Sequence, residues 1–208
     1  MAESYPVNLT IDYPDRKLNR LTSFFRIFVA IPILIVLGLL LADSFNYGGK
    51  DFGASTVAMG IGFTFLPLVL MLIFRRKYPR WWYDWNFNLA GFIYRINAYL
   101  YLMTDVYPST DEEQSVHIDM PYPDASTLNR WLPLVKWFLA IPHLIILVFL
   151  GIAFMVVGII VWFAILFTGK YPRGMFDFVA GVLRWNLRVV AYAIILVTDK
   201  YPPFSLSA

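Results

Sequence analysis

The sequence has 208 residues, of which 59% are hydrophobic and 15% are charged, with a mean hydropathy of +0.62 and a formal net charge of +3. These values exclude an ordinary soluble globular protein and a disordered chain. The absence of cysteine excludes disulfides, thiolate metal sites and thiol nucleophiles. Two histidines and a small net charge give no reason to expect a metal centre or a nucleic-acid partner.

Three apolar regions are long enough to cross a hydrocarbon layer ~30 Å thick, which takes roughly 20 helical residues. Residues 21–42 and 56–74 each predict one transmembrane helix. Residues 131–168 would form a helix ~57 Å long, so the sequence predicts a turn near residues 151–158. The third region then supplies two spans, at 131–150 and 152–168, which makes four spans in two hairpins.

An internal duplication divides the chain into repeats at 1–110 and 111–208. Its markers are Asn19, Arg26 and Ala30-Ile31-Pro32, which recur as Asn129, Lys136 and Ala140-Ile141-Pro142; Lys77-Tyr-Pro-Arg80, Arg95 and Tyr99, which recur as Lys170-Tyr-Pro-Arg173, Arg188 and Tyr192; and Thr104-Asp105, which recurs as Thr198-Asp199. The longer connection between the two spans of the first repeat lies at 43–55. Seven Tyr-Pro dipeptides mark helix boundaries and suit the headgroup level of a membrane.

Each repeat also predicts a strand and a third helix. Alternation of apolar and polar residues indicates strands at 7–13 and 116–122. The segments 81–103 and 175–197 are about long enough to span, but each carries a charged stripe. If they lie in the membrane surface, sixteen of the seventeen Lys and Arg residues fall on one face. The positive-inside rule therefore favours interfacial helices and cytoplasmic termini.

The second repeat resembles a known bacterial family. The segment 128–137 (Leu-Asn-Arg-Trp-Leu-Pro-Leu-Val-Lys-Trp), the Ala140-Ile-Pro142 step, the segment 170–178 and the end at 198–204 are similar to the membrane family called domain of unknown function 4389. The resemblance extends over nearly the whole chain as two tandem copies. It implies an integral membrane protein and no established activity.

The candidate functional residues are basic groups beside aromatic side chains, together with one intramembrane histidine. The predicted headgroup-binding residues are Arg75, Arg76, Lys77, Arg80, Arg95, Lys170, Arg173, Arg184 and Arg188, which suit anionic lipid. His143 is a candidate proton relay or ligand by its predicted depth, although a structural hydrogen bond to a neighbouring carbonyl is the favoured interpretation. Asp84 and Asp177 suit helix capping and ion pairing better than acid–base chemistry.

The sequence thus predicts an all-α integral membrane protein with four transmembrane helices, two amphipathic interfacial helices, two short cytoplasmic strands and an internal duplication. We expect a multi-pass protein of the bacterial inner membrane, without cofactor or enzymatic activity. The leading hypothesis is a scaffold or accessory subunit that contacts anionic lipid and a membrane protein partner. The alternative is a small transporter or lipid-handling protein built as a three-plus-three inverted repeat.

Overall fold

A computed structural model describes residues 5–14, 17–41, 68–112 and 114–207 of the chain. The predicted connection at 43–55 and most of the predicted span at 56–74 lie outside these residues. The described elements, in chain order, are β1 (Asn8–Ile11), α1 (Arg20–Phe24), α2 (Arg26–Leu41), the π-helical segment η1 (Met71–Arg75), α4 (Arg80–Leu100), β2 (Val116–Asp119), α5 (Leu132–Thr168), α6 (Arg173–Val190) and the π-helical segment η2 (Ala191–Ile195). The described chain is therefore mostly helical, with one small sheet.

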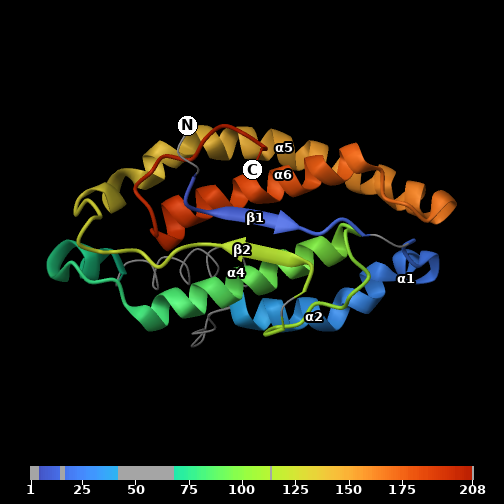
Figure 1. The fold of residues 1–208 in the computed structure, drawn as a ribbon, viewed down its shortest axis with the longest axis horizontal. Helices are drawn as coiled ribbons and strands as arrows, with labels where there is room; N and C mark the ends of the chain where they lie inside the picture. The colour runs from blue at the N-terminus through green and yellow to red at the C-terminus, as the bar shows by residue number, and fades with distance from the viewer. Residues whose placement is uncertain (1–4, 15–16, 42–67, 113, 208) are drawn as a thin grey trace, which may run out of the picture.

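The elements form successive layers, which Figure 1 shows from α5 at the top to α2 at the bottom. α5 packs on α6, α6 on β1, β1 on β2, β2 on α4, and α4 on α2. The sheet therefore lies between the two amphipathic helices α4 and α6. Short α1 joins the two sides, because it contacts both α2 and α5.

The two strands pair antiparallel with each other. Asn8 lies opposite Asp119, and Ile11 lies opposite Val116. Val7 and Leu9 are buried on the helix-facing side, as the alternation predicts. Two strands alone are marginally stable in water, so the helices that cover this sheet stabilise it. The structure confirms the predicted strands and a pairing between them.

The third apolar region is one continuous helix, which corrects the prediction of a hairpin. α5 runs for 37 residues through the predicted turn at 151–158. Gly151 and Gly158 suggested that turn, but both lie inside the continuous helix. At Gly158 a Cβ atom would lie 3.0 Å from the Tyr101 ring, so this glycine allows Tyr101 to approach α5 closely. α5 ends instead at Gly169, whose φ of 71° suits glycine.

Two described helices are long and apolar enough to cross a membrane, and they differ in exposure. In the most apolar stretch of α5, 11% of the residues are buried, whereas 72% are buried in the most apolar stretch of Arg173–Ile195. α5 therefore presents an apolar outer surface, and α6 with η2 belongs largely to the protein core. The predicted helices at 81–103 and 175–197 correspond to α4 and to α6 with η2.

Candidate functional site

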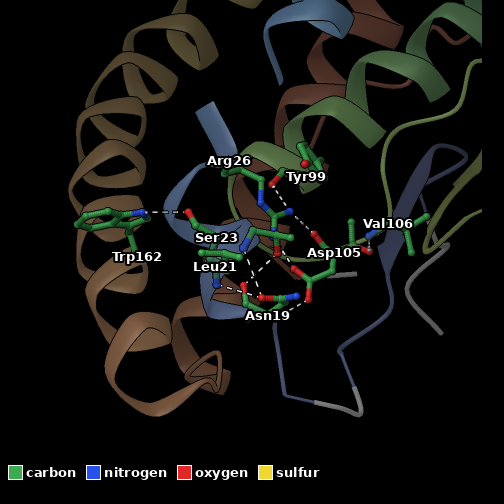
Figure 2. A network of polar contacts seen from close by, with 10 residues as sticks. Asn19, Leu21, Ser23, Arg26, Tyr99, Asp105, Val106 and Trp162 are labelled. Atoms are coloured by element: carbon green, nitrogen blue, oxygen red, sulfur yellow. Dashed lines mark hydrogen bonds and ion pairs between the residues drawn. The ribbon is translucent and has the colours of Figure 1, made fainter. Parts of the chain in front are cut away.

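A buried arginine lies at the centre of a polar network, which Figure 2 shows in close view. Arg26 begins α2 and is 2% exposed. Its Nη2 lies 2.5 Å from Asp105 Oδ1, and its Nη1 donates to the backbone carbonyls of Tyr99 and Thr104. The guanidinium also lies 4.2 Å from the centre of the Tyr99 ring. The second oxygen of Asp105 accepts the backbone N–H of Asn19, the residue that caps α1. We call these five residues the first clamp.

The C-terminal half contains a second clamp of the same kind, formed by Asn129, Lys136, Tyr192, Thr198 and Asp199. The Nζ atom of Lys136, which is buried, lies 2.8 Å from Asp199 Oδ1 and donates to the carbonyl of Thr198 at 2.7 Å. It also lies 5.0 Å from the centre of the Tyr192 ring. Asp199 Oδ2 accepts the backbone N–H of Asn129. Each residue of the second clamp is a sequence-matched counterpart of one in the first.

A left-handed leucine precedes both aspartates. Leu102 has a φ of 62° and Leu196 a φ of 63°, and each lies two residues before a Thr-Asp pair. This conformation costs a non-glycine residue roughly 1–2 kcal/mol. Both leucine side chains are buried, at 3% and 0% exposure, so their packing offsets the strain. The reversal turns the chain at the end of each helical segment and brings the aspartate back to its cation.

Tyrosines of the Tyr-Pro dipeptides connect the two halves. The Tyr13 hydroxyl donates to the carbonyl of Tyr171, and the Tyr122 hydroxyl donates to the carbonyl of Tyr78, both at 2.5 Å. Burial raises the pKa of Tyr78, whose own hydroxyl donates to the carbonyl of Ile195. The Tyr-Pro dipeptides therefore hold one half against the other in addition to ending helices.

The predicted headgroup-binding residues divide into two groups. Six have exposed side chains: Arg75, Arg76, Lys77, Arg80, Lys170 and Arg173. Two of these lie over tyrosines that follow the strands, Arg80 over Tyr122 at 4.9 Å and Arg173 over Tyr13 at 4.6 Å. Arg80 also forms the expected ion pair with Asp84, at 3.2 Å.

The remaining three predicted residues donate to backbone carbonyls. Arg95 bonds those of Ser109 and Thr110. Arg184 bonds those of Leu9 and Leu206, both at 2.8 Å, and Arg188, which is buried, lies 3.4 Å from that of Val7. Residues four apart on a helix are separated by ~6 Å, close to the ~6.7 Å between alternate residues of a strand. Arg184 and Arg188 therefore cover the carbonyls of Leu9 in β1 and of Val7 just before it.

His143 is fully buried and has a specific partner. Its Nδ1 accepts a hydrogen bond from Trp185 Nε1 at 3.0 Å, and its ring stacks on Phe204. Its Nε2 has no hydrogen-bond partner within the described part of the chain. In the N-terminal half, the sequence-matched positions hold Ile33 and Phe92, which pack in one apolar cluster. The observed bond favours a structural role over a proton relay.

An apolar cavity of about 460 Å³ adjoins the first clamp. Its lining comes from α1, the start of α2, the end of α4 with the residues that follow it, and the C-terminal half of α5, and includes Ser23, Arg26, Tyr101, Gly158, Ile159 and Trp162. Trp162 Nε1 donates to the carbonyl of Ser23, which Figure 2 shows as a link between α5 and α1. Within the described ranges, no group of three His, Asp or Glu residues is arranged to hold a metal ion.

The sequence identified the clamp residues as repeat markers and not as a site. The signal was present, because one cation and one aspartate recur in both halves. The sequence could not show that the cation and the aspartate pair, because Arg26 and Asp105 are 79 residues apart. The cavity has no signature in the sequence, because it depends on how α1, α2, α4 and α5 converge.

Comparison with known proteins gives one match. No curated protein and no solved structure matches the chain. The family model described as Domain of unknown function (DUF4389) matches residues 131–205, which include Lys136, His143 and Asp199. The C-terminal part of the chain is thus similar to this family over a single copy of the domain.

Proposed function

We propose that this protein is a non-catalytic integral membrane scaffold or accessory subunit, anchored through α2 and α5, which contacts anionic lipid through its exposed basic residues. The observation that carries the proposal is the outer surface of α5, where large apolar side chains such as Phe138, Phe149 and Phe167 are each at least 68% exposed. A continuous apolar surface of this length is unfavourable in water and suits lipid or a membrane partner.

The exposed basic residues support lipid contact at the two ends of the antiparallel sheet. Arg80 and Arg173 lie at the starts of α4 and α6, beside the tyrosines that follow the two strands. Each basic group near an anionic surface gains about 1 kcal/mol. We restrict the proposed headgroup contacts to the six exposed residues, because Arg95, Arg184 and Arg188 already donate to carbonyls. We propose that the sheet and these basic residues face the cytoplasm, as the positive-inside rule favours.

Two matched clamps support the proposed duplication. Arg26 and Lys136 each lie beside an aspartate, donate to the carbonyl of the threonine before it and lie near a tyrosine ring, although the two halves differ in sequence. A buried ion pair that is held by further hydrogen bonds fixes one arrangement of helices. We therefore assign the clamps to architecture, as a scaffold requires, and not to chemistry.

The strand pairing bears on the alternative of an inverted repeat. In a three-plus-three inverted arrangement, matched elements of the two halves lie on opposite membrane faces. β1 and β2 are hydrogen-bonded to each other, which favours a common face. A topology of four crossings also requires that α5 bends back on itself in a bilayer. In the structure, by contrast, α5 is continuous.

The test is extraction and co-purification from native membranes. After washing with sodium carbonate, we expect the protein to remain in the membrane fraction. After mild detergent extraction, we expect it to migrate with a stoichiometric protein partner. Release by carbonate contradicts membrane anchoring, and a lone monomer or homodimer contradicts the subunit role and leaves lipid handling as the better hypothesis.

A further inference from the structure

We propose that the cavity beside the first clamp holds one acyl chain of a membrane glycerolipid, with the ester carbonyl of that chain at the Ser23 end. The inference rests on the proposed membrane anchoring, because the ligand comes from the surrounding bilayer. The cavity volume of about 460 Å³ falls within the roughly 300–1,000 Å³ typical of small-molecule sites.

The rim of the cavity faces outward and the floor is buried. Ile27, Met155 and Ile159 line it and are 72%, 62% and 61% exposed, whereas Arg26 and Leu102 are at most 3% exposed. The opening therefore lies on the same apolar surface of α2 and α5 that anchors the protein. A chain can enter it sideways from lipid without crossing polar surface.

The depth of the cavity matches part of one lipid leaflet. The α5 residues that line it extend from Met155 to Phe163, about 12 Å along a helix, against ~15 Å of hydrocarbon per leaflet. Trp162 lies at one end, and tryptophan is enriched at the membrane–water interface. Ester groups lie at this same level, so the polar part of a lipid meets the Ser23 end.

The polar atoms at that end suit an uncharged acceptor. Ser23 Oγ and Arg26 Nε are buried and have no hydrogen-bond partner among the described residues, and a serine hydroxyl can turn about χ1 to donate. The charge of Arg26 is already offset by Asp105 at 2.5 Å. A free carboxylate or phosphate would find no net positive charge there, whereas an ester carbonyl needs only a donor.

The test is photolabelling in nanodiscs of phosphatidylethanolamine and phosphatidylglycerol that contain a small fraction of phosphatidylcholine with a diazirine in one acyl chain. We expect residues 155–163 to be labelled at least five-fold more than 144–149, which are also largely exposed on α5. Ile159→Trp, which closes the mouth, should remove this excess. Ile160→Trp is the matched control, because Ile160 is exposed but does not line the cavity.

Competition identifies the polar group. Excess diacylglycerol, an uncharged ester, should suppress the excess labelling, and sodium oleate should not; Ser23→Ala should weaken labelling several-fold. Equal labelling of the two stretches, no effect of Ile159→Trp, or selective competition by oleate would overturn the proposal. Failure of membrane anchoring itself looks different, because it leaves both stretches unlabelled.

Discussion

Each of the two buried cations forms an ion pair with a single aspartate. We therefore expect the clamp residues to be those most sensitive to substitution. In Asp105→Asn, Arg26 remains buried with its charge uncompensated, and loss of one partner of a buried pair costs about 3–5 kcal/mol. We expect a matching drop in the free energy of unfolding, measured in detergent micelles. Asp199→Asn should act in the same way through Lys136.

Asp84→Asn is the matched control for the clamp substitutions. Asp84 also pairs with an arginine, but its side chain is 51% exposed and that of Arg80 is 70% exposed. Exposed pairs of this kind contribute less than about 1 kcal/mol. If Asp84→Asn and Asp105→Asn destabilise the protein equally, the clamp has no special role.

The His143–Trp185 pair offers a double-substitution test of a structural histidine. His143→Ile leaves the buried Trp185 N–H without its acceptor, which costs about 1–3 kcal/mol. His143→Ile with Trp185→Phe reproduces the pair found at Ile33 and Phe92, and should recover most of the lost stability. Unfolding of the two single variants and the double variant measures the coupling. A double variant that is as unstable as the sum of the singles contradicts a purely structural pair.

At the scale of elements, the structure and the sequence-based prediction differ at the long apolar helix α5. The composition of residues 131–168 predicted a helix and membrane affinity; the helix is confirmed, and α5 is long and apolar enough to cross a membrane. The composition did not predict that the helix continues through residues 151–158, because hydropathy measures only the length of an apolar stretch and glycine is tolerated inside apolar helices. The role of Gly158 depends on Tyr101, which no local pattern reveals.

A distance measurement tests the continuity of α5 in a bilayer. Because the chain has no cysteine, spin labels at Leu144→Cys and Phe163→Cys are the only ones present. A continuous helix separates these positions by about 28 Å, whereas a hairpin that turns at 151–158 brings them to about 10 Å. We expect pulsed electron paramagnetic resonance to give the longer distance. The shorter one would restore the four-span topology.

A glycine of α6 fixes the C-terminal segment against the core. A Cβ atom at Gly181 would lie 2.8 Å from Leu206 Cβ and 3.0 Å from its carbonyl oxygen. Gly181→Ala should therefore displace this segment, destabilise the protein by about 1–3 kcal/mol and speed limited proteolysis of residues 200–207. Gly174→Ala on the same helix meets nothing within 4 Å and should leave the cleavage rate unchanged.

For the whole molecule, the strand pair defines how the two halves are joined. The alternation in residues 7–13 and 116–122 was enough to predict both strands, because side chains of a half-buried strand alternate between core and solvent. The side chains that cover the edge of the sheet were harder to predict from the sequence. The charges of Arg184 and Arg188 alone predicted headgroup ligands, but these residues donate to the carbonyls of Leu9 in β1 and of Val7 just before it.

The pairing predicts a cross-link between the halves that also reports the membrane side. Thr10 and His117 are directly opposite each other and exposed. Opposed residues of antiparallel strands have Cα atoms about 4.5–5.5 Å apart, within the range that a disulfide spans. Thr10→Cys with His117→Cys should therefore form an intramolecular disulfide under mild oxidation, seen as a shift in gel mobility that reductant reverses. Thr10→Cys with Asp84→Cys, where the second position lies on α4, is the control.

The single variants Thr10→Cys and His117→Cys test the proposed cytoplasmic face. A membrane-impermeant maleimide should label both in inverted membrane vesicles and neither in intact spheroplasts. Labelling on opposite sides contradicts the strand pairing, and it makes the inverted repeat the better description. Labelling of both from the outer side keeps the pairing but reverses the proposed orientation, because the basic residues beside the sheet would then face away from the cytoplasm.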